Sequence, residues 1–243
     1  MASPRSPRLP DIGGFLSSFF RIARSLTSAT GRSVVWTRLR HGRALHQTAT
    51  TTAPDRYPDL FAALVCLLPP DADILSFGCS TGEELLTLRR LMPMAHIVGV
   101  EINPRARRIA TRATAGDPRI TVAAALPDGQ FDAVLALAVL QREPIRIARD
   151  AVRDLRHHYP FARFDAVLTT LVDRLRPGGV LAVLHAHYRV EDGRVAGQLE
   201  ALVAGPRLSE PLFDRSSRRY DPAPPSASLF RKCAAIASAS PNS

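Results

Sequence analysis

The chain has few of the residues on which several large protein classes depend. Its 243 residues include three cysteines, one tryptophan and one lysine, Lys232. Cys66, Cys79 and Cys233 are widely spaced and form no CxxC pair, so a disulfide framework and a cysteine-rich metal site are both excluded. We expect no metal. A reduced, cytoplasmic setting is the simplest interpretation of so few thiols.

Long apolar runs are also missing. The longest candidate, "FAALVCLL" at 61–68, stops at two prolines. This run is far shorter than the roughly 18 residues that a membrane-spanning helix needs, and it is typical of the end of a buried helix. Hydrophobic residues still make up 46% of the chain, which is enough for a substantial core. The length suits one domain of ordinary size with extra segments.

Acidic residues are scarce near the N-terminus. Residues 1–52 hold eight arginines and one acid, Asp11, so this segment carries +7 of the net charge of +10. Such an asymmetry is typical of tails that bind nucleic acid. The alternative is a general preference for arginine over lysine. We favour this alternative and expect no nucleic-acid partner, because the body of the chain shows no interleaving of basic and aromatic residues.

The N-terminal extension, residues 1–54, is predicted to be basic and partly disordered. Within it, apolar residues recur at steps of three and four between residues 11 and 27, which predicts an amphipathic helix. That helix could lie on an anionic membrane surface, contact a partner, pack on the main domain or belong to a cleaved presequence. A polar linker follows it.

Beyond the linker, strand and helix patterns alternate. Strands are predicted at 73–77, 95–102, 119–126, 131–140, 179–188 and 227–235, and helices at 82–91, 104–114, 142–158 and 161–174. Most of these strands are apolar throughout, which indicates a parallel sheet covered on both faces. The pattern therefore predicts a doubly wound, Rossmann-like α/β domain over residues 55–235, followed by a disordered tail at 236–243.

A glycine loop follows the first predicted strand. Residues 78–82 read "GCSTG" and lead directly into the first helix of the pattern. In doubly wound sheets, ligands bind beyond the carboxyl ends of the strands. Gly78 and Gly82 allow unusual dihedrals and a close approach, and the small residues between them leave backbone amides free to face a polar ligand. A tight turn without a ligand is the alternative.

An acid stands at the end of the next predicted strand. Glu101, in "VGVEINP", lies 23 residues after Gly78. A carboxylate there can accept both hydroxyl protons of a ribose, as in dinucleotide-binding folds. However, Glu83 and Glu84 follow the loop directly and would repel a pyrophosphate. A nucleoside whose other end is a cationic amino acid fits this charge pattern better than a nicotinamide dinucleotide.

These motifs together resemble a known family. "ILSFGCSTGEE", "VGVEINP", "FDAVLALAVLQ" and "LRPGGVLAVLH" are similar to successive motifs of the class I S-adenosylmethionine-dependent methyltransferases. The resemblance covers about residues 55–190. It implies a seven-stranded sheet with a late strand inserted antiparallel, and S-adenosylmethionine as the cofactor. Within the family, the string "GCSTGEE" is most similar to the chemotaxis receptor methyltransferases.

The resemblance also implies a set of cofactor-binding residues. It places Gly78, Cys79, Ser80 and Gly82 along the methionine part, Glu101 on the ribose hydroxyls, Ile102 and Leu126 beside adenine, Leu137 near the sulfonium, and Glu83 as a further cofactor contact. One departure concerns the acid that many members carry two residues before the first loop glycine, because Ser76 stands there instead.

Candidate catalytic residues follow the later strands. His185 and His187, in "LHAHY", flank the predicted end of a strand, and alternation would place both on one face. Either could take a proton from a hydroxyl, although a hydrogen-bonded structural histidine is the simpler alternative. Gln141 and Arg142 follow the fourth strand, where they would contact the substrate. Arg142 could bind a carboxylate or phosphate, or be a surface residue.

The expected function is methyl transfer from S-adenosylmethionine to a small molecule. Oxygen is favoured over nitrogen as acceptor. No Asn-Pro-Pro-Tyr or Asp-Pro-Pro-Tyr motif follows the fourth strand, which argues against methylation of nucleobases or glutamine amides on nitrogen. Two alternatives remain at this point. A protein methyltransferase would use the basic extension to recruit its partner, and a non-catalytic protein would bind the cofactor or a nucleoside without turnover.

Overall fold

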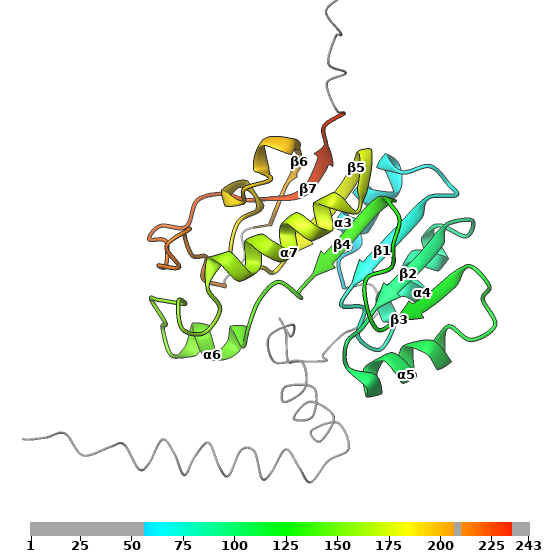
Figure 1. Cartoon of the computed structure of the whole chain (residues 1–243), viewed down its shortest axis with the longest axis horizontal. Coiled ribbons are helices and arrows are strands. Elements are labelled where there is room, and N and C mark those ends of the chain that lie inside the picture. The colour runs from blue at the N-terminus through cyan, green and yellow to red at the C-terminus, as the bar shows by residue number, and fades with distance from the viewer. Residues whose placement is uncertain (1–55, 207–209, 235–243) are drawn as a thin grey trace, which may run out of the picture.

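The computed structural model describes residues 56–206 and 210–234. These residues form a seven-stranded sheet with helices packed against it (Figure 1). In chain order the elements are α3 (Pro58–Leu67), β1 (Asp73–Phe77), α4 (Glu83–Leu91), β2 (His96–Val100), α5 (Pro104–Ala113), β3 (Ile120–Ala123), β4 (Phe131–Leu137), α6 (Pro144–Arg149), α7 (Phe161–Asp173), β5 (Leu175–Leu184), the short 3-10 turns η1 (Val190–Asp192) and η2 (Ala196–Gln198), β6 (Leu199–Ala204) and β7 (Ala227–Lys232).

The strand order is β3-β2-β1-β4-β5-β7-β6. The first five strands in this order run parallel to one another, whereas β7 pairs antiparallel with both β5 and β6. The predicted doubly wound sheet with a late antiparallel insertion is therefore confirmed. Strand β6 was not predicted; it is an edge strand with four of its six residues exposed, so its sequence lacks the pattern of a buried strand.

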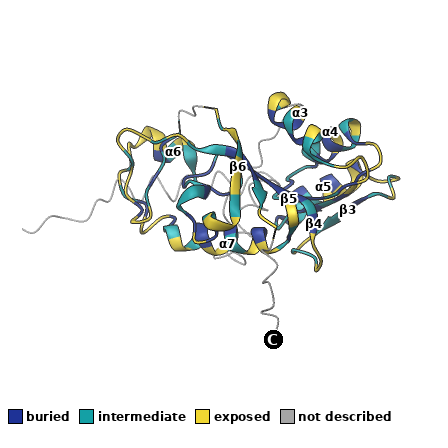
Figure 2. Cartoon of the chain, turned by 90° about the horizontal axis from the view of Figure 1, so that it is seen from above, coloured by how far each residue is buried: buried dark blue, intermediate teal, exposed yellow. Residues whose placement is uncertain are grey.

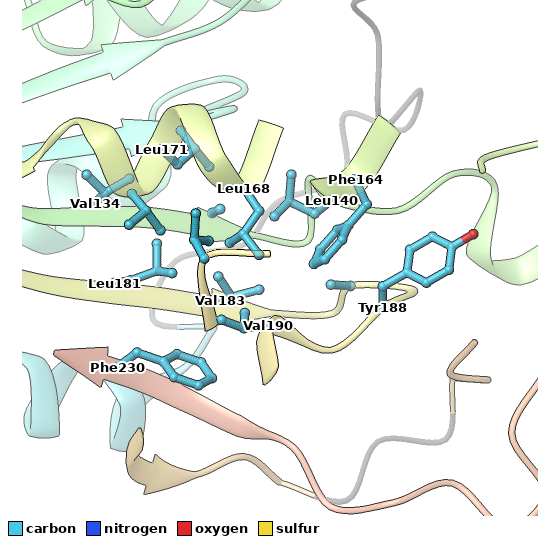
Figure 3. Close-up of a cluster of buried hydrophobic side chains, with 14 of the residues drawn as sticks. Val134, Leu140, Phe164, Leu168, Leu171, Leu181, Val183, Tyr188, Val190 and Phe230 are labelled. Carbon is cyan, nitrogen blue, oxygen red and sulfur yellow. The ribbon is translucent and has the colours of Figure 1, made fainter. Parts of the chain in front are cut away.

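Each face of the sheet has its own core. On one face, α3 and α4 place Leu64, Leu85 and Leu88 against strand residues such as Ile74. On the other face, α7 places Phe164, Leu168 and Leu171 against β4, β5 and β7 (Figure 3). Figure 2 shows α3 and α7 on opposite sides of the sheet. Burial on both faces explains why the central strands are mainly apolar on both faces, with Ser76 of β1 and Asp132 of β4 as exceptions. The N-terminal extension, including residues 11–27, lies outside the described residues.

Several predicted boundaries are wrong, and the strands expected at 119–126 and 131–140 end earlier, at Ala123 and Leu137. The helix expected at 142–158 is limited to Pro144–Arg149, because the next residues leave helical geometry at Ala151, which has a φ of +46°. The strand expected at 179–188 begins earlier, at Leu175, and ends at Leu184. His185 ends it with a left-handed φ of +53°, which breaks the extended backbone. Within the described ranges, no helix is both long and apolar enough to cross a membrane.

The turn between β1 and α4 is built around Gly78. Its φ is +82°, a region that favours glycine, and a Cβ at this position would lie 2.6 Å from Cγ2 of Val139. Val139 follows β4, so the loop after β4 packs directly on the glycine turn. Gly116 has a similar φ of +94°, but nothing lies within 4 Å of its missing Cβ.

We expect Gly78→Ala to destabilise the fold more than Gly116→Ala does. Both substitutions carry the cost of a left-handed alanine, but only the first also forces atoms against Val139, which adds roughly 1–3 kcal/mol. Urea unfolding of the two variants and of the unmodified chain measures the difference. Equal losses at both positions would contradict the close contact between the two loops.

The single lysine of the chain fixes the end of α7. Lys232 Nζ donates to the carbonyl oxygens of Val172 and Leu175, each at 2.8 Å. These carbonyls lie where α7 ends and β5 begins, so one ammonium group joins β7 to the helix on its face. A cation near a helix C-terminus also interacts favourably with the helix dipole.

Lys232→Met should therefore lower the free energy of unfolding by about 2 kcal/mol, because methionine keeps the apolar stem but loses both charged hydrogen bonds. Arg231→Met on the same strand is the matched control, since no side-chain hydrogen bond of Arg231 is seen within the described part of the chain. Thermal and urea unfolding measure both variants. A similar loss in the control would assign the effect to charge alone.

Candidate functional site

Four parallel strands end at one edge of the sheet, and the candidate site lies beyond them. The glycine loop follows β1, Glu101 follows β2, Ala138 follows β4 and His185 follows β5. Three non-glycine residues at this edge have left-handed backbones, with φ values of 51° at Ser80, 56° at Ala138 and 53° at His185. Strained backbone of this kind concentrates at functional sites.

The glycine loop is fixed to the end of β2. The amides of Gly78 and Cys79 both donate to the carbonyl oxygen of Val100, at 2.8 and 3.1 Å. The amide of Ser80 donates to Oε2 of Glu101 at 3.0 Å. The structure therefore brings the loop and the acid together, as the spacing in the sequence predicts.

The Glu101 carboxylate is oriented on both sides. Besides the bond from Ser80, its Oε1 accepts the amide proton of Asn103 at 2.6 Å. Burial raises the pKa of Glu101, and the amides of Asn103, Ser80 and Ile102 together with the charge of Arg107 partly offset this rise. Each carboxylate oxygen can accept a second hydrogen bond, so the group can still receive two ribose hydroxyls. In this respect the site fits the nucleoside of S-adenosylmethionine.

The two acids at the start of α4 point to different places. Both oxygens of Glu83 lie within 2.8 Å of the Thr81 hydroxyl, so this side chain folds back on its own loop. Glu84 turns toward the sheet instead, and the Ser76 hydroxyl of β1 donates to its Oε1 at 2.7 Å. Burial of this carboxyl group raises the pKa of Glu84 to about 7.

Cys79 lies under the loop as a neutral, packed thiol. It is buried, and a Cβ on Gly99 of β2 would lie 2.8 Å from its sulfur. Burial, together with the charge of Glu101, raises the pKa of Cys79 far above its usual range. A thiol in this state is no nucleophile. Cys79 instead fills the space between the loop and the sheet.

His185 forms a polar pair at the end of β5. Its Nδ1 lies 2.9 Å from Oε1 of Glu210, which belongs to the segment between β6 and β7. The ring of Tyr57, just before α3, lies against it with the ring centroids 5.5 Å apart. The Tyr57 hydroxyl is buried and has no hydrogen-bond partner among the described residues. Burial raises the pKa of Tyr57 to about 12, so this hydroxyl keeps its proton.

His187 lies on the other side of the sheet. Its ring is fully buried edge-on to Tyr159 and Phe213, and its Nε2 donates to the carbonyl oxygen of Arg142 at 2.9 Å. Burial lowers the pKa of His187. The prediction that both histidines share one face is wrong, because the left-handed turn at His185 interrupts the alternation on which it rests.

The remaining predicted residues surround this edge. Gln141 is 4% exposed, and its Nε2 donates to the carbonyl oxygen of Ala138 at 3.3 Å. Arg142 is half-buried after β4, and Leu137 is buried at the end of that strand. Ile102 directly follows Glu101, and Leu126 packs against the core on the α7 side. Their roles toward the cofactor or substrate stay predictions.

Sequence reasoning missed three residues of this site: Tyr57, the inward-facing Glu84 and Glu210. Tyr57 stands at the start of a helix, a position that suggested only the end of a linker. Glu84 formed part of an acidic pair in which the other member seemed the better contact. Glu210 belongs to an irregular segment with no motif, so only the fold brings it to His185.

Comparison with known protein families finds a match for the central part of the chain. Residues 75–183 match the family described as "Methyltransferase domain". This segment runs from β1 through most of β5 and includes the glycine loop, Glu101 and the loop after β4. No curated protein matches the sequence.

Several solved structures are similar to part of this chain. A candidate rRNA-methylase from Clostridium thermocellum is 12% identical over 76% of this chain and 98% of its own, with a TM-score of 0.47. The [4+2]-cyclase SpnF is 24% identical over 53% of this chain and 43% of its own, with a TM-score of 0.40. PKMT2 from Rickettsia typhi, in complex with AdoHcy, is 19% identical over 52% of this chain and 24% of its own, with a TM-score of 0.37.

This chain thus spans less than half the length of the last two proteins. The family match, the strand order and the loop with its acid agree with one another. Residues 75–183 thus resemble a methyltransferase domain in sequence, and the strand order and the loop with its acid agree with the class I methyltransferase fold that the sequence predicts.

Proposed function

We propose that this protein transfers the methyl group of S-adenosylmethionine to an oxygen atom of a small molecule. The observation that carries the proposal is the pair of His185 and Glu210 at the same strand edge as the glycine loop and Glu101. Methyl transfer needs little from a protein beyond positioning, but a hydroxyl acceptor also needs a base to take its proton. A histidine beside a carboxylate supplies that base.

The cofactor would lie across the ends of β1 and β2. Glu101 would accept the ribose hydroxyls, since its carboxylate is already fixed by the amides of Ser80 and Asn103. The open backbone of the glycine loop would allow a close approach of the amino-acid part. When bound, the cofactor supplies a methyl group on a positively charged sulfur. A nucleophile attacks the methyl carbon in line and displaces the sulfur.

The carboxylate of Glu210 determines how His185 acts. An imidazole whose Nδ1 proton points at a carboxylate keeps Nε2 free as the acceptor. Nε2 of His185 would take the proton that an acceptor hydroxyl loses as the new oxygen–carbon bond forms and the methyl–sulfur bond breaks. The adjacent negative charge stabilises the imidazolium that results.

Tyr57 would limit the size of the acceptor. Its ring covers one side of His185, and its buried hydroxyl can donate a hydrogen bond to an acceptor that enters there. Such an enclosed base favours a small molecule over a folded protein surface. Gln141 and Arg142 follow β4 at the same edge and are proposed as further substrate contacts.

Glu101→Ala should weaken binding of S-adenosylhomocysteine by on the order of 2–4 kcal/mol, because two charge-assisted hydrogen bonds are lost. Calorimetric titration measures the change, with NAD as the competing ligand class. Exposed Glu200 on β6 provides the control, since Glu200→Gln should bind as the unmodified protein does. Preferential binding of NAD, or full affinity in Glu101→Ala, would contradict the proposed cofactor site.

His185→Gln should lower kcat by roughly 10²–10⁴-fold, the usual contribution of a positioned base. Affinity for S-adenosylhomocysteine should stay within about threefold of the unmodified protein, and Glu210→Gln should show a smaller loss of kcat. Turnover is followed as formation of S-adenosylhomocysteine with a panel of phenols and hydroxy acids, and with amines as the competing class. His157→Gln is the control, because this histidine is exposed.

Unchanged turnover in His185→Gln would remove this residue from the chemistry. Methylation of amines alone would overturn the choice of oxygen as acceptor. Tight binding without turnover of either class would favour the non-catalytic alternative.

A further inference from the structure

Arg107 of α5 turns its guanidinium back toward the end of β2. Its Nη1 donates to the carbonyl oxygen of Glu101 at 2.9 Å and, over a longer distance of 3.5 Å, to that of Ile102. The neighbouring Arg108 is exposed, and its Nε donates to the carbonyl oxygen of Pro104 in its own helix at 3.3 Å. Two adjacent arginines therefore have different partners, and those of Arg107 belong to the candidate site.

The carbonyl groups that Arg107 binds lie where the pairing of β2 ends. Strand β2 ends at Val100, and the amide of Glu101 still donates to the carbonyl oxygen of Ala123 at the end of β3, at 3.0 Å. Backbone groups beyond the end of a strand need other hydrogen-bond partners, and a segment without them can reorient its side chains. The guanidinium of Arg107 therefore fixes the backbone over the two residues that follow β2.

The carboxylate of Glu101 is held from the same helix. The amide of Asn103 donates to Oε1 of Glu101 at 2.6 Å. The side chain of Asn103 in turn caps α5, because its Oδ1 accepts the amide protons of Arg105 and Ala106. Asn103 is buried, so this cap is enclosed by the fold. Helix α5 thus contacts Glu101 at both its carboxylate and its carbonyl group.

Arg107 favours the ionised form of Glu101 without occupying its carboxylate. Neither residue forms a salt bridge with any residue that the structure describes. Burial raises the pKa of Glu101, and the charge of Arg107 opposes this rise. A direct salt bridge would use the lone pairs that ribose hydroxyls need. Contact through the backbone leaves those lone pairs open to a ligand.

We propose that Arg107 is a positioning residue for the cofactor. By fixing the backbone of Glu101 and Ile102, it holds the Glu101 carboxylate in the orientation in which both ribose hydroxyls can donate to it. This inference rests on the proposed function, in which Glu101 is the ribose contact. In this role Arg107 acts through Glu101 rather than on the cofactor itself.

A purely structural role for Arg107 predicts a different result. An arginine that only joins α5 to the sheet would lower stability when it is removed, and would weaken the binding of all ligands alike. A positioning role concerns the hydrogen bonds from the ribose, so its loss should weaken only ligands that carry the ribose hydroxyls. Comparing S-adenosylhomocysteine with its analogue that lacks both the 2′- and the 3′-hydroxyl therefore separates the two roles.

Calorimetric titration of Arg107→Met with both ligands measures the difference. Methionine keeps much of the apolar stem and removes the guanidinium. We expect the affinity for S-adenosylhomocysteine to fall roughly tenfold to thirtyfold, because two charge-assisted hydrogen bonds from the ribose lose their alignment. The affinity for the analogue without hydroxyls should stay within about threefold of its value in the unmodified protein, which also shows that the variant is folded.

Further variants control for charge and for the route through Glu101. Arg108→Met removes the same charge from the adjacent, exposed position and should bind both ligands as the unmodified protein does. Arg107→Lys keeps a positive group that can reach one of the two carbonyl oxygens, so it should recover part of the lost affinity. When Glu101→Ala is already present, adding Arg107→Met should weaken binding by less than about threefold, since both residues act on the same hydrogen bonds.

The outcomes separate this inference from the proposed function. Unchanged affinity for S-adenosylhomocysteine in Arg107→Met, or an equal loss with both ligands, overturns the positioning role and leaves the cofactor in place. A loss in Arg108→Met as large as that in Arg107→Met overturns it as well, because the effect would then belong to net charge. Failure of the unmodified protein to bind S-adenosylhomocysteine, or full affinity in Glu101→Ala, overturns both.

Discussion

The hydrogen bond from the Ser80 amide to Glu101 joins the two halves of the site. One half is a turn that follows β1, and the other is the first residue after β2. Because β1 and β2 are adjacent and parallel, their carboxyl ends meet at one edge, and a single carboxylate can contact the loop while facing a ligand. The proposed position of the nucleoside depends on this contact.

Much of this arrangement could be predicted from local sequence. The apolar strands, the glycine loop and Glu101 all depend on spacing within one strand–helix–strand unit, where the chain has little freedom. The seven-stranded order followed from resemblance to a family. These features agree with the structure because both local pattern and topology specify them.

The other half of the site depends on contacts between distant segments. His185 meets Glu210 from 25 residues away, and Tyr57 reaches them from before the first described helix. No spacing rule connects such positions. The alternation rule failed for His185 and His187 for a related reason, since it assumes extended backbone and the structure turns at His185. Local strain of this kind is decided by tertiary contacts.

The structure of the region after α6 also could not be predicted from local sequence. Its sequence has helical periodicity, but its backbone pairs with the segment before β7 instead, through Leu155 to Ser217 and Arg219 to Arg153. The buried hydroxyl of Tyr188 donates to the Tyr159 carbonyl and accepts a hydrogen bond from the Ser217 hydroxyl, which stabilises this contact between segments. Tertiary hydrogen bonds have overridden helix propensity here.

The chemistry of Lys232 has a practical consequence. It is the only ε-amine in the chain, and both α7 and β5 use it through backbone carbonyls. Reagents that acylate amines therefore meet one side-chain target, and that target must leave its carbonyl partners before it can react. The rate at which such a reagent labels Lys232 thus reports how often β7 separates from α7. This residue can therefore serve as a probe of local opening at the antiparallel end of the sheet.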